Sequence, residues 1–378
     1  MPEKTFIDIH LIQTVPFSNL NRDDTGSPKT GTFGGVTRAR VSSQAQKHAV
    51  RDTFAVQLPA EQLGTRSKRW PKIVSDRIGD LAPEIDAEVR AELAKAVLEA
   101  VGFKIPAVKA KKDEEAPEPQ TQYLVFLGNR QLDRLAQAAV ESHRTGEKLD
   151  KKQLKPLADT DQAVDIALFG RMLADAADLN VDAAAQVAHA VSVHAVDNEW
   201  DFFTAVDDEA PADNLGAGMM GTIEFNSSTL YRYASVNARA LASSLGDTAN
   251  AAQVVGAFVR AFATTLPSGK SNTFANFTLP EAIVVTVRRD QPVNFVGAFE
   301  TAVVPSADGR SRAEVTATRL ASYAADVEQA YGNPAVASYV VRLGEATAAL
   351  DAIGERTSLP ELVASLERVV GERLTEHA

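Results

Sequence analysis

The order in which strand and helix patterns follow one another constrains the fold of this 378-residue chain more than any other feature. Strands are predicted where β-branched and apolar residues alternate, and helices where apolar residues recur every three or four positions. The predicted order is strand, helix, strand, strand, helix, strand, at residues 5–15, 42–55, 189–196, 221–237, 248–266 and 281–289. This is the ferredoxin-like or RRM-type α+β arrangement, whose open sheet face is a common platform for single-stranded RNA. The standard RNP1 octapeptide of RRM domains is not present.

Two segments interrupt this core. Residues 58–187 carry amphipathic patterns and predict a helical insertion, in which the charged, proline-rich segment Val108–Gln122 is expected to be a solvent-exposed loop. Residues 197–220 begin with aromatic residues and continue with Gly, Asp and Pro, which predicts a protruding hairpin. Helices are predicted at Glu88–Val101, Arg130–Arg144 and Asp161–Ala177 in the insertion, and near Arg312–Tyr331 and Leu359–Leu374 in the tail.

The composition excludes several classes of protein. The chain has no cysteine, so disulfides, thiolate metal sites and cysteine nucleophiles are excluded. Its six histidines show no metal-ligand spacing. No apolar run reaches the ~18 residues of a membrane span, and the N-terminus lacks the apolar core of a secretory signal. We therefore expect a cytoplasmic protein with no membrane contact, metal or cofactor.

One stretch departs from the acidic balance of the chain, whose formal net charge is −11. Residues 20–51 hold six basic side chains and only two acidic ones. Lys47 and Arg51 share a face of the predicted helix, and Arg38 and Arg40 share a face of the extended segment before it. The residues alone leave two interpretations open, a track that binds successive RNA phosphates or a solvated charged face. The six basic residues are Arg22, Lys29, Arg38, Arg40, Lys47 and Arg51.

Two segments partly match a phosphate-binding loop of the Walker A type. In GSPKTGT, Gly26 and Gly31 have the required spacing, but Thr32 stands where the lysine must be. In SGKS, Lys270 follows a glycine, but Thr264 stands where the first glycine must be. Nucleotide hydrolysis is therefore not expected.

Polar residues in the same region have local structural explanations. Asp23 and Asp24, like Asp207 and Asp208, resemble the paired carboxylates of two-metal nucleases, but adjacent Asp residues are also common turn formers. Ser43, with Gln46 three residues later, predicts a capping box at the start of the helix. No G-x-S-x-G motif surrounds the serines, so a serine nucleophile is not indicated.

The segment WDFFTAVDD places three aromatic residues at the base of the predicted hairpin. Exposed aromatic side chains stack on bases or insert between them. The alternative is that Trp200, Phe202 and Phe203 form a small core of the hairpin itself. Because successive strand residues point to opposite faces, only one of Phe202 and Phe203 is expected to face a base.

Three motifs together resemble a known family. They are LNRDDTGSPKTGTFGGVTRARVSSQAQKHAVR, WDFFTAVDD and GTIEFNSSTLYRYASVN. Their order and spacing resemble those of the backbone subunit of the type I-E CRISPR surveillance complex, Cascade, known as the CasC family. The resemblance extends from the N-terminus to about residue 300, and the final helices fit more loosely.

The resemblance implies a non-catalytic protein with an RRM-like palm, helical fingers and a β-hairpin thumb. It implies head-to-tail polymerisation, with six copies expected, along the spacer of one CRISPR RNA (crRNA), which then pairs with a target DNA strand. The large, small and crRNA-processing subunits of the complex are further expected partners. The palm is assigned to residues 1–57, 188–196 and 221–378, the fingers to 58–187 and the thumb to 197–220.

The resemblance also implies roles for single residues. Lys29, Lys47 and Arg51 fall on positions that contact guide phosphates in the family, and Phe202 and Phe203 match its aromatic pair beside the kinked nucleotide. Met172 falls where a fingers residue packs against a base, although a methionine in a helix core is the alternative. The other residues expected to line the RNA groove are Arg22, Arg38, Arg40, Ser42 and Gln44, with Lys270 as a further backbone contact.

Two other functions remain open at this point. A metal-dependent ribonuclease, as found among backbone subunits of other CRISPR types, would use Asp23 and Asp24. An RRM-like RNA chaperone would bind RNA as a monomer and would not need the hairpin. The sequence also departs from the family where Val36 and Thr37 follow the double glycine, because relatives can carry basic residues there.

Overall fold

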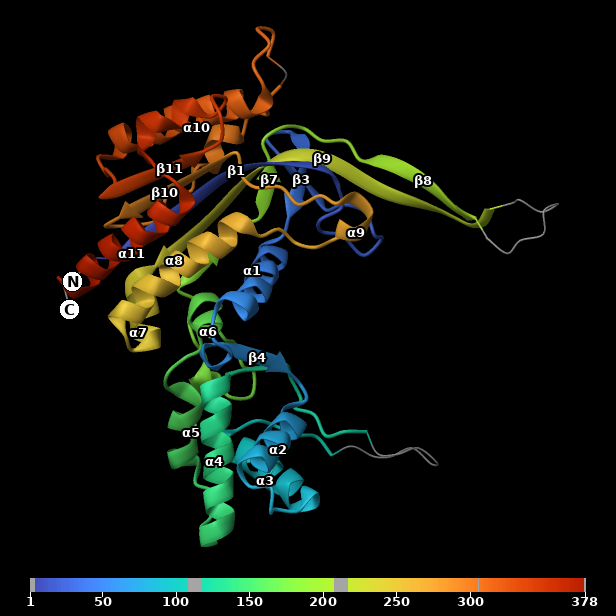
Figure 1. Ribbon diagram of the computed structural model, residues 1–378, viewed down its shortest axis with the longest axis vertical. Coiled ribbons are helices and arrows are strands. Elements are labelled where there is room, and N and C mark those ends of the chain that lie inside the picture. Colours follow the sequence, from blue (N-terminus) through green and yellow to red (C-terminus); the bar gives the residue numbers. More distant parts are fainter. Residues whose placement is uncertain (1–3, 108–116, 207–216, 305, 377–378) are drawn as a thin grey trace. The chain divides into compact units, whose positions relative to one another are not determined.

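The computed structural model describes residues 4–107, 117–206, 217–304 and 306–376, which fold into two compact units (Figure 1). The sheet unit comprises Met1–Thr53, Gln186–Ala238 and Val255–Ala378, and the helical unit comprises Phe54–Ala185 and Arg239–Val254. Residues 108–116 of the predicted exposed loop, and the hairpin tip with Asp207 and Asp208, lie outside the described residues. Within the described ranges no helix is long and apolar enough to cross a membrane.

A mixed sheet is the centre of the sheet unit, as the predicted fold class requires. Its order is β12-β11-β10-β1-β9-β7-β3-β2, and β6 and β8 also pair with β9. The four strands β10-β1-β9-β7 have the order of a ferredoxin-like sheet, with β1 between β10 and β9. The strands are β1 (Phe6–Ser18), β2 (Thr30–Phe33), β3 (Val36–Val41), β6 (Ala185–Val187), β7 (Ala190–Ser192), β8 (Glu199–Val206), β9 (Ala217–Asn237), β10 (Ala282–Arg288), β11 (Ala337–Arg342) and β12 (Glu355–Arg356).

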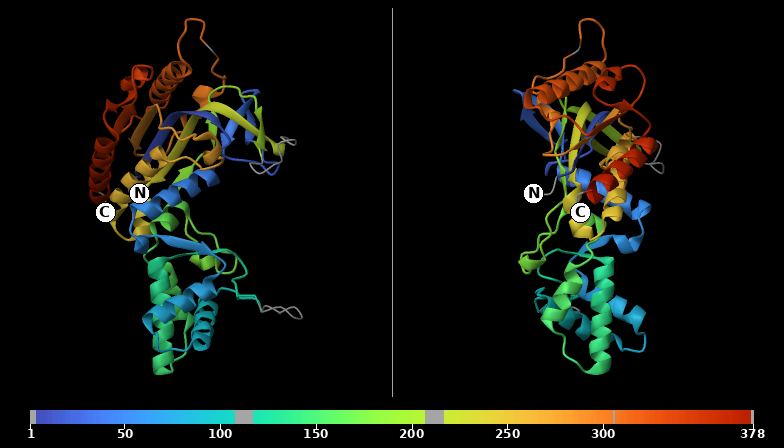
Figure 2. Two further views of the ribbon diagram at one scale, coloured as in Figure 1. Left: turned by 45° about the vertical axis from the view of Figure 1, so that its right-hand side comes forward. Right: turned by 90° about the vertical axis from the view of Figure 1, so that its left-hand side faces the viewer.

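The predicted strands and tail helices are all present, although residues 189–196 form only the three-residue β7, while β2, β3, β6, β11 and β12 are additional. Figures 1 and 2 show α10 on one side of the sheet and α8 and α11 on the other. The helices of this unit are α1 (Ser43–Gln57), α8 (Thr248–Thr264), α9 (Ser271–Phe274), α10 (Arg312–Tyr331) and α11 (Leu359–Thr375), with the 3-10 turns η3 (Phe295–Phe299) and η4 (Ala348–Ile353).

The sheet face that is open in RRM-type domains is covered in this chain. His10, Tyr231 and Tyr233 occupy that face, but all three are buried beneath η3 and α10. The His10 ring stacks on Phe295 at 4.5 Å between ring centroids, and its Nδ1 lies 2.8 Å from the Tyr231 hydroxyl. Because α10 contributes Leu320 and its neighbours to the same core, this face cannot be the platform for RNA.

The opposite face is held by a buried arginine. Arg232 on β9 donates to the Phe262 carbonyl at 2.8 Å and to Gln13 Oε1 at 2.6 Å, which joins the sheet to α8. Its Nε also donates to Gln46 Oε1 at 3.2 Å, which fixes the first turn of α1 against the sheet. Burial lowers the pKa of Arg232 to about 9, so the guanidinium still carries its charge at neutral pH.

The helical unit has a separate core. Trp70, Val74, Leu98 and Leu135 are buried in it, and Trp70 Nε1 donates to the Val125 carbonyl at 3.0 Å. A two-stranded sheet of β4 (Gly64–Ser67) and β5 (Val125–Gly128) lies in the same unit. The other elements are η1 (Ala60–Gln62), α2 (Trp70–Leu81), α3 (Ala87–Val101), α4 (Asn129–Thr145), α5 (Lys151–Asp159), α6 (Val164–Phe169), η2 (Ala177–Leu179) and α7 (Ala238–Leu245).

The predicted helix Asp161–Ala177 is largely wrong, because α6 ends at Phe169. Gly170 follows with a φ of +80°, and a Cβ at this position would lie 2.9 Å from the Val181 carbonyl oxygen. Arg171 then exchanges both backbone hydrogen bonds with Val181, so the chain folds back instead of continuing as a helix. A long-range pairing therefore overrides the local helical pattern.

Candidate nucleic-acid interface

The Gly-rich loop that begins the basic motif is tied to neighbouring elements at both ends. Asn19 Nδ2 donates to the carbonyls of Gly26 at 3.0 Å and Glu224 at 2.9 Å, which closes the loop onto β9. Asn21 accepts from the Lys29 amide through its carbonyl at 2.8 Å and from the Ser42 amide through Oδ1 at 2.9 Å. The loop, β2 and the start of α1 therefore form one connected framework.

Lys29 and Arg40 lie side by side on this framework. The Arg40 amide donates to the Lys29 carbonyl at 2.9 Å, and Arg40 Nε donates to the Thr30 carbonyl at 3.1 Å. Arg40 Nη1 lies 3.0 Å from Nδ1 of His189, a residue 149 positions away in the sequence. Partial burial and the charges of Arg40 and Lys29 lower the pKa of His189, which favours the neutral ring. Lys29, Arg40 and His189 together form a positive cluster, whose two charges are those of Lys29 and Arg40.

The first helix begins one residue earlier than the predicted cap implies. Ser42, not Ser43, caps α1, because its Oγ accepts from the Ala45 amide at 3.2 Å. Gln46 is buried and donates to the Ala188 carbonyl at 2.9 Å, so the predicted capping box is wrong. Gln44 is exposed in the first turn.

Lys47 and Arg51 are one turn apart on α1, as predicted, and both side chains are half-buried. Their spacing places the two cations on one helix face, where they can meet neighbouring phosphates. Each also interacts with other residues of the chain, so neither is a freely moving surface charge.

Arg38 does not share the exposure of Arg40, although it lies two residues away on β3. Its side chain is fully buried, and its guanidinium is held by four backbone carbonyls, which removes it from the surface track. The adjacent turn fits the same region tightly, because Gly34 has a φ of +59° and a Cβ there would clash with the Glu300 carbonyl. The four acceptors are Phe33 at 3.1 Å, Ser192 at 2.8 Å, Phe299 at 3.0 Å and Glu300 at 3.0 Å.

The SGKS segment packs against the same loop. Gly269 packs directly on it, because a Cβ at this position would lie 2.4 Å from the Leu20 carbonyl oxygen. The next residue, Lys270, adopts a left-handed conformation with φ of +52° and is half-buried. A hollow of about 520 Å³ is lined by Leu20–Gly26, including the exposed Arg22, and by Gly269.

Asp23 has a structural role in this loop. Its Oδ1 accepts from the amide of Thr25 at 2.9 Å, from the hydroxyl of Thr25 at 2.7 Å and from the amide of Ser27 at 3.0 Å. The bonds to Thr25 and Ser27 hold the pKa of Asp23 below its usual value. Asp24 is exposed, and the described residues include no group of three or more His, Cys, Asp or Glu placed to hold a metal ion. The ribonuclease alternative is therefore not favoured.

The predicted aromatic hairpin is the two-stranded ribbon of β8 and the first part of β9 (Figure 1). Trp200 and Phe202 lie on one face of β8, and both are about two-thirds exposed at 65% and 64%. Phe203 lies on the other face and covers Gly221, where a Cβ would come within 2.4 Å of its ring. The two phenylalanines thus face opposite ways, as predicted, and Phe202 is the more accessible one.

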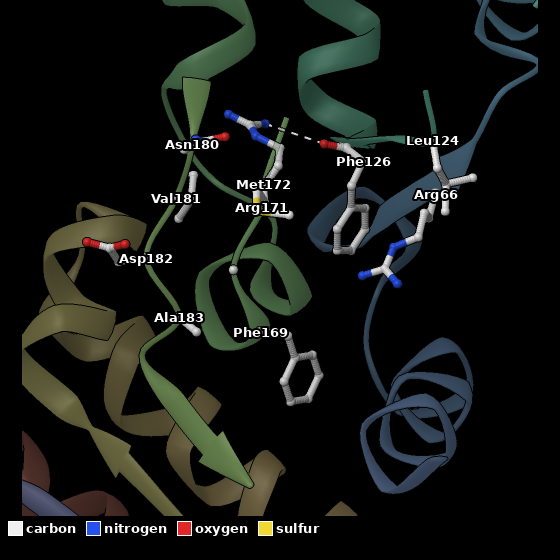
Figure 3. Close-up of a pocket in the computed structure, with 11 residues that line it drawn as sticks. Arg66, Leu124, Phe126, Phe169, Arg171, Met172, Asn180, Val181, Asp182 and Ala183 are labelled. Carbon is white, nitrogen blue, oxygen red and sulfur yellow. Dashed lines mark hydrogen bonds between the residues drawn. The ribbon is translucent and has the colours of Figure 1, made fainter. Parts of the chain in front are cut away.

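The helical unit contains a separate pocket of about 670 Å³ (Figure 3). Met172 lies at this pocket and is 89% exposed, so the helix-core interpretation of this residue is wrong. The Arg66 guanidinium lies 4.8 Å from the centroid of the Phe126 ring, and the two residues are paired across β4 and β5. Leu124 and Phe169 add apolar surface to the lining. A flat apolar group can therefore pack against this part of the pocket.

His189 is the residue of the positive cluster that the sequence patterns did not identify. Its position at the start of a predicted strand gives no sign of its neighbours, because contact with Arg40 depends on how β7 pairs with β3. A local pattern cannot specify that pairing.

Comparisons with known proteins place these features in a family. The family model described as CT1975-like protein matches residues 7–365 of the chain. A chain from a structure titled "CRISPR RNA-guided surveillance complex, pre-nicking" is 36% identical, with a TM-score of 0.83 over 97% of this chain and 100% of that chain. A chain from a structure titled "CRISPR RNA-guided surveillance complex" is 31% identical, with a TM-score of 0.73 over 96% of this chain and 99% of that chain. No curated protein matches the chain.

Proposed function

The chain belongs to the CT1975-like protein family, and we propose from this premise that it is a non-catalytic backbone subunit of a type I-E CRISPR surveillance complex, Cascade. In this role several copies polymerise head to tail along one crRNA. They hold its spacer by phosphate contacts, kink it with the β8–β9 hairpin, and present it to a target DNA strand in antiviral defence. The titles of the two matching structures, both surveillance complexes guided by CRISPR RNA, support this role.

The observation that carries the proposal is the convergence of cations from separate segments beside the hairpin. Lys29 and Arg40 are held together on the loop and β3, and Lys47 and Arg51 follow along α1. Phosphate contacts position a nucleic acid without reading its sequence, which is what a subunit that must accept any guide requires. Base pairing by the guide then supplies the specificity, as in other RNA-guided effectors.

The hairpin supplies the second part of the role. Trp200 and Phe202 present an exposed aromatic face on β8, which can stack on a base or insert beside one. The root of the hairpin adjoins the Gly-rich loop, because Asn19 bonds to the Glu224 carbonyl on β9. The aromatic face and the cationic track, which consists of Lys29, Arg40, Lys47 and Arg51, therefore belong to the sheet unit. In the proposed role both contact the same RNA strand.

Three further residues extend the proposed contacts. Arg22 lines the hollow beside the loop, and Lys270 directly follows Gly269, which also lines it; in this role both side chains bind guide phosphates. Met172 packs against a base from the pocket of the helical unit. Arg38 is left out of the proposal, because its guanidinium is buried and fully used by carbonyl groups.

The proposed partners follow from this role. They are the crRNA, the target DNA strand paired with it, five further copies of the chain in a six-copy filament, and the large, small and crRNA-processing subunits. A filament of this kind needs a heterologous interface between copies, in which two different surfaces of the chain meet. The acidic balance of the whole chain limits binding of unrelated nucleic acid outside the cationic track.

Native mass spectrometry of the purified protein, with and without one crRNA, tests the proposal. Stepwise addition of several protomers to a single intact RNA is the expected result. A maximum of one protomer per RNA would support a chaperone-like RNA binder instead. Shortened RNA would instead support the metal-dependent ribonuclease. In that case the substitution Asp24→Ala would have to abolish the cleavage.

A further inference from the structure

His189 is held in place on both sides of its backbone. The preceding residue, Ala188, donates through its amide to the Tyr233 carbonyl at 2.9 Å and accepts from Gln46 Nε2 at 2.9 Å. The following residue, Ala190, begins β7 and pairs with Val41 of β3. The exposed side chain of His189 therefore projects from a fixed position at the edge of the cationic track.

Arg40 determines which nitrogen of the His189 ring carries a proton. A guanidinium has only donors, so in the 3.0 Å contact between Arg40 Nη1 and His189 Nδ1 the histidine nitrogen must accept. The neutral ring consequently carries its proton on Nε2. Nε2 has no hydrogen-bond partner among the residues that the structure describes.

The surroundings also keep this ring neutral. Partial desolvation of the ring comes first among the causes that lower the pKa of His189, followed by the charges of Arg40 and Lys29. A second proton would add a third positive charge to a cluster that already contains two. The result is an uncharged N–H donor beside two cations, where the local potential favours an anion.

We propose that His189 is an additional guide contact, in which its Nε2–H donates a hydrogen bond to a phosphate oxygen of the RNA that Lys29 and Arg40 bind. This inference rests on the proposed function, because it assumes that the cationic track holds RNA. Arg40 acts twice, since it binds the phosphate chain and fixes the tautomer that makes His189 a donor. His189 differs from the other members of the track because it contributes a hydrogen bond but no charge.

This difference has a measurable signature. Binding of single-stranded nucleic acid through cations releases counterions, and each contact adds about 0.7 to the slope of log K against log salt. A neutral donor releases none. Loss of the His189 contact should therefore weaken binding equally at every salt concentration, whereas loss of the Lys29 charge should also make the slope shallower.

The experiment measures the affinity of the full-length protein for one labelled crRNA over a series of KCl concentrations. His189→Asn keeps an acceptor near the position of Nδ1 for Arg40 but has no donor that reaches as far as Nε2. We expect binding about 3- to 10-fold weaker with an unchanged salt slope, as for one lost neutral hydrogen bond. His189→Gln, whose amide reaches further, should recover part of the affinity, and Lys29→Gln should lower the slope by ~0.7.

Each other outcome would overturn the inference. Wild-type affinity in His189→Asn would show that the ring makes no contact, and a shallower slope would show that it binds as a cation. If the loss disappears on a DNA strand of the same sequence, the donor reads a ribose 2′-hydroxyl and the phosphate assignment is wrong. Failure of the wild-type protein to bind any guide would refute the proposed function itself and is thus distinguishable.

Discussion

Arg38 and Arg40 should respond in opposite ways to the same substitution, although they lie two residues apart on one strand. Arg38 is fully buried, and its guanidinium donates four hydrogen bonds of 2.8–3.1 Å to backbone carbonyls. Those carbonyls belong to the last residue of β2, to the end of β7, and to the end of η3 with the residue after it, so one side chain joins three parts of the sheet unit. Arg40 is half-exposed and bonds to one carbonyl and to His189.

The cost of Arg38→Gln can be worked out from these bonds. A buried carbonyl that loses its partner costs about 1–3 kcal/mol, and glutamine can replace at most two of the four donors. The substitution should therefore destabilise the β2–β3 hairpin by about 3–5 kcal/mol, a large part of the 5–15 kcal/mol typical of a domain. Arg40→Gln leaves only one backbone carbonyl, that of Thr30, without its donor. It should lower the free energy of unfolding by less than about 1 kcal/mol.

Hydrogen–deuterium exchange of peptides from β3 and β7 gives a local measure of this loss. At about 1.4 kcal/mol for each factor of ten, Arg38→Gln should accelerate exchange there at least about 100-fold. Arg40→Gln should change the exchange rates little. It should instead weaken guide binding and make the salt slope shallower by ~0.7, because one phosphate contact is lost.

The opposite pattern, in which Arg38→Gln alters guide binding and Arg40→Gln alters protection, would refute these assignments. Unchanged protection in Arg38→Gln, together with a shallower salt slope, would show that Arg38 leaves its carbonyl partners and binds phosphate. That result would restore the role expected from its place in the basic motif. Arg38→Lys provides a further check, because it keeps the charge but cannot reproduce a planar set of donors, and it should still lose protection.

Two further predictions concern charge and pH. The double variant Lys47→Gln, Arg51→Gln should lower the slope of log K against log salt for guide binding by ~1.4, since two contacts are removed. Burial lowers the pKa of His10 to about 3, so protonation of the unfolded chain should remove stability below pH 6.5, at up to about 1.4 kcal/mol per pH unit. Burial raises the pKa of Asp8 to about 6, so the protonation of Asp8 in the folded state adds stability as the pH falls from 6 to 3.8. Because Asp8 is present in both proteins, its effect cancels in the difference between wild type and His10→Asn. The measurement is therefore this difference in the free energy of urea unfolding, at pH 7 and at pH 5.

Matched controls accompany both measurements. Lys95→Gln, Arg368→Gln makes the same change in charge at two exposed helical residues that pair with glutamates four positions later, and its salt slope should equal that of wild type. For His10, the free energy of unfolding of wild type relative to that of His10→Asn should fall by about 2 kcal/mol from pH 7 to pH 5. Parallel pH profiles would show that the buried ring is not the source.

Much of the fold was predictable because it depends on local patterns. Alternation in β1 and β9 and the apolar periodicity of α8, α10 and α11 identify these elements, and their order indicates the ferredoxin-like sheet. Helix α6 shows where this reasoning fails, because the pairing of Arg171 with Val181 ends a helix that the pattern extends. The packing of α10 on the sheet face of Tyr231 and Tyr233 was likewise not predictable. The local pattern of a helix or a strand does not specify which element packs against it.

The sequence by itself determined which residues are basic, how they are spaced, and that the chain resembles a family of CRISPR surveillance-complex subunits. Only the tertiary structure decided which of these residues have a free surface. Two arginines with the same chemistry and spacing have different roles, because β7 and η3 surround Arg38 and leave Arg40 beside His189. The physical reason is that burial and hydrogen bonding depend on neighbours more than 140 residues away along the chain, which no local pattern specifies.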